Sequence, residues 1–344
     1  MNKHIISKDK TLLEALSQIN SIGLPLVLFV VDENNRMVGS LTDGDSRRAL
    51  IAGASVNDKA ETIMHSDFNF ISIDDITNVK ELKRLKGLNM KLLPVLDKEM
   101  HIVEIIDLYK YKTRLPVDAV IMAGGKGERL RPLTEKKPKP LLPIGGKAII
   151  DHNIDRLIEF GVNHIFVTVN YLKEQLEEHY QVARNGVLVK TVREPKFLGT
   201  IGSVKFVENF YNDTILLMNS DIFTNIDYED FYLHFKQHDA IMSVAAIPYN
   251  VSIPYGILDL NGRNITGLLE KPKYTYYANA GIYLIKKSAL NLIPDDVFFN
   301  ATDLVEKLIS INEKVIRYPL NGTWIDIGNP QEYQKAQDLV KHLR

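Results

Sequence analysis

The sequence has no cysteine among its 344 residues. This absence excludes disulfide bonds, thiolate metal sites and cysteine nucleophiles, and it suits a reducing compartment. The sequence also has no excess of charge of either sign, since 42 Lys and Arg residues balance 43 Asp and Glu residues. A net charge of −1 gives no general attraction to nucleic acid or to an anionic membrane surface.

Long apolar segments are absent as well. The longest apolar run, around residues 24–31, is far shorter than the ~20 residues that cross a bilayer. Charged residues interrupt the start of the chain, where a signal peptide would need an apolar core. We therefore expect a cytoplasmic protein with no membrane partner. The composition, 45% hydrophobic and 25% charged, excludes a mainly disordered chain, and the length suggests about two domains.

The first 115 residues contain an approximate internal repeat. Residues 31–42 align with residues 95–107, so that Asp32 corresponds to Asp97, Gly39 to Glu104 and Thr42 to Asp107. Each copy predicts a strand, a polar turn and a second strand, and each follows a segment with helical spacing of apolar residues. Such repeats commonly bury their apolar faces against each other.

This half resembles a tandem pair of CBS domains, an α+β module, most specifically in the stretch M-V-G-S-L-T-D-G-D at residues 37–45. The resemblance implies that Thr42 and Asp45 hold the ribose or phosphate of an adenine nucleotide. The second copy departs from the pattern at Glu104 and Asp107. The alternative is a packing and oligomerisation module that binds no ligand. Because CBS pairs commonly associate face to face, we expect a homo-oligomer.

The dipeptide Leu115-Pro116 predicts a boundary between domains 1–115 and 116–344. Beyond it, apolar strands at 117–122, 165–169, 187–192 and 215–218 alternate with helical patterns, including one at 172–183. This alternation predicts an α/β fold with a mostly parallel sheet covered by helices. Ligands of such sheets bind at the carboxyl ends of the strands, so polar motifs that follow strands are candidate site residues.

The first of these motifs occupies residues 123–143 and reads A-G-G-K-G-E-R-L-R-P-L-T, followed by P-K-P-L-L-P. Its three glycines let backbone N–H groups approach a phosphate closely. Seven Lys or Arg residues oppose two Glu residues between positions 126 and 147, which indicates a polyphosphate site. The motif is neither a Walker A loop nor a dinucleotide-binding G-x-G-x-x-G, because Leu130 stands where the third glycine would be.

These residues resemble the signature of sugar-1-phosphate nucleotidylyltransferases, and the similarity covers residues 117–335. The resemblance implies a Rossmann-like, GT-A-like mixed sheet that is mostly parallel. It also implies that Arg129 holds the triphosphate and that Lys139 contacts the α-phosphate and the incoming sugar phosphate. The nucleotide would be lined by Ala123, Gly124, Gly125 and Gly127.

Two aspartates are the metal ligands that this resemblance implies. Asp221 follows the strand at 215–218, and Asp326 lies in the downstream motif W-I-D-I-G-N-P. Their carboxylates suit Mg²⁺, a hard cation that also binds phosphate oxygens. Ser220, in the place of a more usual glycine, departs from the family pattern.

The loop E-P-K-F-L-G-T-I-G, which begins at Glu194, reads the base in that family. A carboxylate accepts two hydrogen bonds, and guanine offers adjacent N–H donors, whereas thymine and uracil need an acceptor and a donor together. Glu194 therefore favours GTP, with Gly199 and Thr200 in the same loop. The alternative is that Glu194 caps the loop while the backbone of Gly199 reads the base.

The sugar side rests on three shorter motifs, Y-G, E-K-P and N-A-G-I-Y. The resemblance implies that Lys271 binds the sugar phosphate and that Glu270 binds sugar hydroxyls. Ordinary sheet packing is the alternative for Tyr283. The full set of expected sugar-binding residues is Tyr255, Gly256, Glu270, Lys271, Asn279 and Tyr283.

The expected reaction joins an NTP, most favourably GTP, to a sugar 1-phosphate and releases pyrophosphate. The fusion to CBS domains is similar to a bacterial group that makes GDP-glucosamine from glucosamine 1-phosphate for legionaminic acid. Mannose 1-phosphate and heptose 1-phosphate are alternatives, as are uridylyl and thymidylyl transfer. A different class, a non-catalytic subunit that senses a nucleotide or an NDP-sugar, is motivated by Ser220 and the CBS pair.

Overall fold

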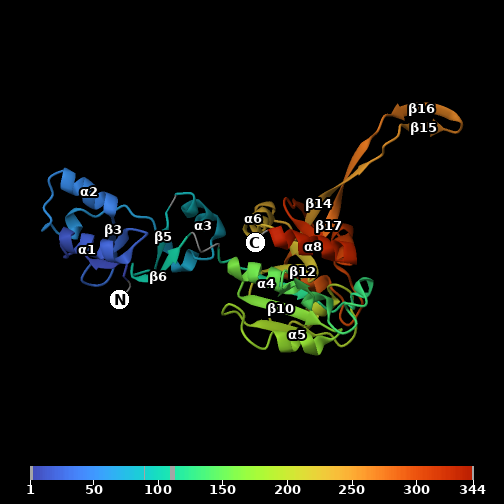
Figure 1. The fold of residues 1–344 in the computed structure, drawn as a ribbon, viewed down its shortest axis with the longest axis horizontal. Coiled ribbons are helices and arrows are strands. Elements are labelled where there is room, and N and C mark those ends of the chain that lie inside the picture. Colours follow the sequence, from blue (N-terminus) through green and yellow to red (C-terminus); the bar gives the residue numbers. More distant parts are fainter. Residues whose placement is uncertain (1–2, 89, 109–112, 343–344) are drawn as a thin grey trace. The chain divides into compact units, whose positions relative to one another are not determined.

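The chain divides into two compact units, Met1–Arg114 and Leu115–Arg344 (Figure 1). A computed structural model describes residues 3–88, 90–108 and 113–342. Among these residues no helix is both long and apolar enough to cross a bilayer.

The first unit contains two three-stranded sheets with the same topology, β1-β2-β3 and β4-β5-β6. In each sheet the first strand pairs parallel and the last pairs antiparallel with the middle strand. Val30 pairs with Gly39 and Val95 with Glu104, which are equivalent positions in the repeat. The elements are β1 (Ile5–Ser7), α1 (Leu12–Ile22), β2 (Val27–Val31), β3 (Met37–Thr42), α2 (Asp43–Ile51), β4 (Ile71–Ser72), α3 (Val79–Lys86), β5 (Leu92–Leu96) and β6 (Ile102–Asp107).

The two copies pack against each other within this unit. Phe29, Met37 and Leu96 form a shared buried cluster, and the backbone N–H of Met37 donates to the carbonyl of Met100 at 2.8 Å. At Gly39 a Cβ would lie 2.5 Å from the Met64 sulfur and 3.0 Å from the carbonyl oxygen of His65, so a larger residue there would require the Met64 side chain to move. The structure thus shows two units that bury apolar faces against each other, as the repeat predicts.

The second unit is built on a seven-stranded sheet with the order β11-β10-β7-β12-β17-β14-β18. Strands β11, β10, β7 and β12 are parallel, β17 is antiparallel to both of its neighbours, and β14 and β18 pair parallel. The predicted α/β class and the mostly parallel sheet are therefore confirmed. The strands are β7 (Asp118–Met122), β10 (His164–Val169), β11 (Val189–Arg193), β12 (Thr214–Asn219), β14 (Met242–Ser252), β17 (Lys273–Lys286) and β18 (Val315–Pro319).

Short hairpins and helices complete this unit. The helix expected at 172–183 is shorter, because Leu172 is in the left-handed region at φ 48° and the helix ends before Tyr180. The paired short strands are β8 (Pro143–Ile144) with β9 (Lys147–Ala148), β13 (Ile222–Thr224) with β19 (Trp324–Asp326), and β15 (Ile257–Asn261) with β16 (Asn264–Leu269). The helices are α4 (Ile149–Glu159), α5 (Lys173–His179), α6 (Tyr228–His238), α7 (Ala301–Ser310) and α8 (Pro330–His342).

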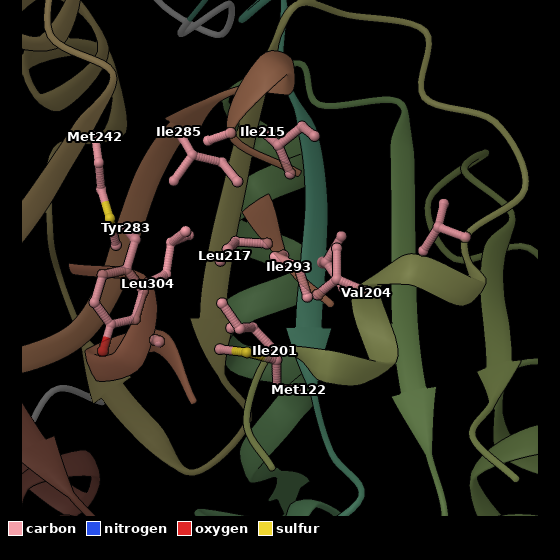
Figure 2. Packing of buried hydrophobic residues seen from close by; sticks show 14 of the residues in the cluster. Met122, Ile201, Val204, Ile215, Leu217, Met242, Tyr283, Ile285, Ile293 and Leu304 are labelled. Carbon is pink, nitrogen blue, oxygen red and sulfur yellow. The ribbon is translucent and has the colours of Figure 1, made fainter. Parts of the chain in front are cut away.

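The core of the second unit lies against the central sheet. All five residues of β7 are buried, which is typical of a parallel strand covered on both faces. Leu217 on β12, Ile285 on β17 and Leu304 on α7 belong to one buried cluster with Ile201 and Val204 (Figure 2). This packing holds the carboxyl ends of β7, β10 and β12 together at one edge of the sheet.

Strands β14 and β17 continue beyond this sheet as a two-stranded arm that ends in the β15–β16 hairpin (Figure 1). The arm begins just after the register shift between Val244 and Ala246. From Ala246 paired with Asn279 to Ser252 paired with Lys273, the ladder runs without interruption. Because Ala246 also pairs with Pro319 of β18, we call the residues beyond this first pair, 247–278, the arm.

Candidate active site

A cavity at the carboxyl ends of β7, β10 and β12 has a volume of about 640 Å³. Its wall combines the glycine-rich loop after β7, Asn170 after β10 and Asp221 after β12. This position is the one that the strand–helix alternation predicts for a ligand. Other lining residues are Gly124, Gly125, Lys126, Gly127, Glu128, Arg129, Lys139, Glu194, Phe197, Gly199, Thr200, Ser203, Ser220 and Gly328.

The glycine-rich loop is fixed by neighbouring backbone at both ends. The N–H of Ala123 donates to Thr168 at 3.0 Å, and the Thr134 hydroxyl donates to the carbonyl of Gly127 at 2.9 Å. A side chain at Gly124 would collide with the carboxylate of Glu194. Gly127 has φ 63°, and a Cβ there would lie 2.9 Å from the Cβ of Lys139. These positions need glycine because the backbone and neighbouring side chains approach one another closely.

Two cations lie on this loop and on the segment after it. Lys139 is only 8% exposed, and its ammonium group forms an ion pair with the carboxylate of Asp221. Arg129 is exposed and lies over Gly328, where an added Cβ would be 3.4 Å from its guanidinium group. The structure therefore brings the P-K-P-L-L-P motif to the first aspartate motif, and Arg129 to the second.

The two aspartates, which are far apart in the sequence, are brought together by backbone pairing. Strand β13 pairs antiparallel with β19 so that Ile222 is opposite Asp326, and the N–H of Ile327 donates to the carbonyl of Asp221 at 3.0 Å. Burial and the neighbouring carboxylate of Asp221 raise the pKa of Asp326. Two close carboxylates repel each other unless a cation lies between or beside them.

This donor set fits Mg²⁺. It consists of the Asp221 carboxylate in the wall of a cavity large enough for phosphates and the neighbouring Asp326 carboxylate, and Mg²⁺ usually takes one or two protein carboxylates together with phosphate oxygens and water. The ammonium of Lys139 contacts Asp221, which compensates part of the carboxylate charge in this structure. Asp221 and Asp326 are the residues that would hold the ion.

Glu194 is 3% exposed and lines the same cavity. Burial raises its pKa, although the N–H of Leu198 donates to its Oε2 at 3.2 Å and so favours the charged form. One carboxylate oxygen thus caps the loop, while Oε1 lies beside Gly124. Both interpretations of Glu194 are compatible with this geometry, because a loop cap and a base-reading acceptor use different oxygens.

Gly199 and Thr200 join this loop to the start of α7. Gly199 has φ 79°, and a Cβ there would lie 2.7 Å from the carbonyl of Phe299. The N–H of Thr200 donates to Asn300 at 3.1 Å, and its hydroxyl accepts from the N–H of Ala301 at 2.8 Å. The first N–H groups of a helix lack partners within the helix, so Thr200 satisfies one of them. The Thr200 hydroxyl therefore caps α7, and the same residue also lines the cavity.

A second cavity of about 280 Å³ shares Thr200 and Asn219 with the first and is also lined by Asn279, Tyr283 and Asp326. The side-chain amide of Asn279 donates to the Tyr283 hydroxyl at 2.9 Å. The Tyr283 ring is buried in the core, and burial raises its pKa. Tyr283 thus serves both in sheet packing and in the wall of the expected sugar pocket.

The other expected sugar-binding residues do not lie at this cavity. Tyr255 and Gly256 precede β15, and Glu270 and Lys271 follow β16, so all four are on the arm. They are exposed, Tyr255 by 74%, and none of them lines either cavity. The physical reason is the uninterrupted ladder between β14 and β17, which carries these residues away from the sheet.

In the first unit, Thr42 and Asp45 line a separate cavity of about 530 Å³ with Arg48 and His65. They form a capping box at the start of α2, in which the Thr42 hydroxyl donates to Asp45 at 2.7 Å. Although burial opposes it, hydrogen bonds from Thr42 and Arg48 lower the pKa of Asp45. His65 is 2.9 Å from the same carboxylate. Asp45 is therefore already engaged by protein groups.

Sequence reasoning missed several residues of the large cavity. Asn170 follows β10 directly, so the rule that ligands bind after parallel strands could have found it. Phe197 is 55% exposed at the rim and packs edge-on against Phe298 at 5.8 Å. Ser203 closes the stretch of sequence that begins at Glu194 and is expected to read the base, but no role was assigned to its side chain.

Comparison with known proteins gives two family matches. The family described as nucleotidyl transferase matches residues 118–342, and the family described as CBS domain matches residues 1–51. A Methanocaldococcus jannaschii protein named bifunctional protein GlmU is 36% identical over 232 residues, covering 65% of this chain and 54% of that protein. A Xenopus tropicalis protein named mannose-1-phosphate guanylyltransferase catalytic subunit beta is 27% identical over 227 residues, covering 62% of each.

The chain thus spans between about half and two thirds of the length of these curated relatives. Among solved structures, a Bacillus anthracis protein provisionally named a glucose-1-phosphate thymidylyltransferase superposes with a TM-score of 0.53 at 22% identity. The match covers 66% of this chain and 96% of that one. This likeness supports the fold. The family match over residues 118–342, together with the cavity at the sheet edge, shows that the chain belongs to the nucleotidyl transferase family, with a CBS domain at its N-terminus.

Proposed function

We propose that the second unit transfers a guanylyl group from GTP to a sugar 1-phosphate and releases pyrophosphate. The observation that carries this proposal is that Arg129, Lys139 and Asp221 line one cavity beside a glycine-rich loop, while Asp326, brought next to Asp221 by strand pairing, lines the adjoining smaller cavity. Transfer of a phosphoryl-type group depends mainly on alignment and on neutralisation of charge, and these residues supply both.

The sugar phosphate is already anionic, so the reaction needs no general base. One of its oxygens attacks the α-phosphorus in line, a new P–O bond forms, and the bond to the bridging oxygen of pyrophosphate breaks. Lys139 is placed to neutralise the α-phosphate, and Arg129 to hold the β- and γ-phosphates. A bound Mg²⁺ ion, held by Asp221 and Asp326, would supply further neutralisation of phosphate charge.

Two observations support GTP as the nucleotide. Glu194 presents a buried carboxylate at the cavity wall, and guanine offers two adjacent N–H donors to such a group. One of the curated relatives is named a guanylyltransferase. For the acceptor we propose glucosamine 1-phosphate, which would make the product GDP-glucosamine, a precursor for legionaminic acid made in the cytoplasm. Mannose 1-phosphate and heptose 1-phosphate are the alternatives.

The test is pyrophosphate release with Mg²⁺ from each of GTP, ATP, UTP and dTTP, combined with glucosamine, N-acetylglucosamine, glucose, mannose and heptose 1-phosphates. Turnover confined to GTP with one sugar phosphate supports guanylyl transfer and names the acceptor. Turnover with UTP or dTTP instead contradicts the role of Glu194. Nucleotide binding without any pyrophosphate release would favour a non-catalytic sensor, the function motivated by Ser220 and the CBS domain.

For the first unit we propose that its cavity binds an adenine nucleotide. Arg48 at the cavity wall is 69% exposed in its side chain, so it can contact a phosphate while Asp45 orients it. Calorimetric titration with AMP and ATP tests this. Arg48→Ala should weaken binding, whereas Arg47→Ala is the matched control because Arg47 pairs with Asp43 and does not line the cavity. If the two variants change binding equally, the cavity does not bind the nucleotide through Arg48, and the first unit would have a packing role only.

A further inference from the structure

The arm of the second unit exposes an unusual amount of apolar surface. In the β15–β16 hairpin the aliphatic side chains are 47–63% exposed, and they are Leu258, Leu260, Ile265, Leu268 and Leu269. Along the strands that lead to the hairpin, Tyr249, Tyr276 and Tyr277 are 57–60% exposed. Contiguous apolar surface of this kind marks an interaction site in a soluble protein.

The hairpin is also too small to be stable by itself. A two-stranded hairpin in water is marginal at best and needs a further strand or a packing surface. Beyond the sheet, β14 and β17 pair only with each other, and β15 and β16 pair only with each other, among the described residues. We therefore expect another surface to cover the arm.

The geometry of the ladder prevents the hairpin from reaching the cavity of its own chain. Seven consecutive pairs connect Ala246–Asn279 to Ser252–Lys273, and six steps of about 3.4 Å separate Asn279 from Lys273 by about 20 Å. Asn279 lines the smaller cavity, whereas Lys271 lies beyond the far end of this ladder. Contact between Lys271 and its own cavity would require the paired strands to bend back or separate.

The smaller cavity lacks a cationic side chain, whereas the arm carries two lysines. Among the described residues that line it there is no Lys or Arg, and its charged group is the carboxylate of Asp326. A sugar 1-phosphate is a dianion, which needs a cation on its sugar side as well as on its nucleotide side. The end of the arm carries Lys271 and Lys273, and it also carries Tyr255 and Glu270 beside them.

We propose that two copies of this chain exchange their arms, so that Tyr255, Glu270 and Lys271 of one copy complete the sugar-phosphate cavity of the other. The charge complementarity between the arm and the smaller cavity identifies a second copy as the occupant, and the incomplete cavity gives the exchange a function. The role of Lys271 in this exchange rests on the proposed transferase activity. Reciprocal exchange about a two-fold axis makes both sites complete and covers both hairpins.

Subunit complementation tests the exchange with full-length chains. Asp221→Asn and Lys271→Met chains with different affinity tags are co-expressed, and assemblies that contain both are isolated by two successive tag purifications. At a sugar 1-phosphate concentration well below the wild-type KM, which is used throughout, each variant alone should release little pyrophosphate. In the mixed assembly one site combines an intact Asp221 with an intact Lys271, so roughly half of the wild-type activity should return. Activity no higher than that of the parents would overturn the proposal.

A reciprocal control uses wild-type chains mixed with chains that carry both substitutions. If arms are exchanged, each site of the mixed assembly contains one defect, and activity should fall at least tenfold below wild type. If each arm serves its own chain, the wild-type chain keeps a complete site and half of the activity remains. The second result would overturn arm exchange and would favour an arm that folds over its own cavity.

The mass in solution gives a readout that does not depend on activity. Analytical ultracentrifugation of Leu258→Ser/Leu268→Ser should show a particle with half the mass of the wild type, because these leucines lie on the hairpin that the exchange would cover. An unchanged mass together with no activity in the complementation test would overturn the exchange. If the wild type releases no pyrophosphate with any substrate pair, the proposed transferase function fails, and a halved mass would still support the exchanged arm.

Discussion

On the nucleotide side of the candidate site, strand ends of one sheet hold Asp221, Asn170 and the glycine-rich loop around a single cavity. On the sugar side, Asn279 and Tyr283 lie in the sheet, whereas Tyr255, Glu270 and Lys271 lie on an exposed arm. Both sides were expected from motifs in the sequence, which are shorter on the sugar side. A sequence motif therefore identifies a side chain, but the packing of the strand or loop that carries the motif decides where this side chain lies.

The largest expected effect concerns the nucleotide side. Asp221→Asn removes one of the two carboxylates brought together by β13 and β19, and turnover should fall at least about 10³-fold, about 4 kcal/mol of transition-state stabilisation. Steady-state pyrophosphate release measures this. Asp295→Asn is the matched control, because Asp295 is an exposed carboxylate paired with Lys205 that lines neither cavity. Similar losses in the two variants would contradict the metal assignment.

The arm should show a smaller and more selective effect. Lys271→Met should raise KM for the sugar 1-phosphate about ten- to a hundredfold and leave KM for GTP unchanged, since a charge-assisted contact is lost on one substrate only. Lys273→Met tests a lysine two residues away and should change either constant less than Lys271→Met does. Initial rates with one substrate varied at a time separate these outcomes. Equal changes in the KM for the sugar 1-phosphate and the KM for GTP would contradict a contact between Lys271 and the sugar 1-phosphate.

The selection of the nucleotide base tests the role of Glu194 on the nucleotide side. Glu194→Gln replaces an acceptor pair by an acceptor and a donor, so the ratio of kcat/KM for GTP to that for UTP should fall about tenfold. The same substitution keeps an oxygen that can accept from the N–H of Leu198. Competition between the two nucleotides at equal concentration measures the ratio. An equal loss of kcat/KM for GTP and for UTP would show that Glu194 only caps the loop and does not select the base.

The smallest expected effect concerns the packing of the glycine-rich loop. Gly124→Ala introduces a methyl group against the Glu194 carboxylate and should lower the free energy of unfolding by about 1–3 kcal/mol. Gly125→Ala is its matched control for stability, because no atom lies within 4 Å of a Cβ at that position. Urea denaturation compares the two. A stable Gly124→Ala variant would show that the loop relaxes readily.

Much of the fold could be predicted from local patterns. Apolar runs such as 215–218 and the turns between them indicated parallel strands, and the repeat in the first unit indicated two units that bury their apolar faces against each other. The bounds of α5 were harder to predict, because neither the left-handed conformation of Leu172 before its start nor its end before Tyr180 follows from the spacing of apolar residues. The length of the arm was not predictable, because an exposed ladder and a buried one have the same alternation.

In the candidate site, too, some features could be predicted from the sequence and others could not. The glycines, Lys139 and the two aspartates could be identified as site residues because phosphate and metal chemistry need those residue types. The ion pair between Lys139 and Asp221 could not be predicted, since it joins residues that are distant in sequence. The capping role of Thr42 and Asp45 was also missed, although the T-x-x-D spacing at a helix start is a signal for it.

By itself, the sequence determined the chemistry: a nearly neutral chain without thiols, a cation-rich glycine loop, two carboxylates and an acceptor at Glu194. Only the tertiary structure decided which of these groups meet. Pairing of β13 with β19 joins Asp221 to Asp326, and the ladder of β14 with β17 separates Lys271 from Asn279. The physical reason is that backbone hydrogen bonds between distant strands set these distances, and no local pattern of residues encodes which strands pair.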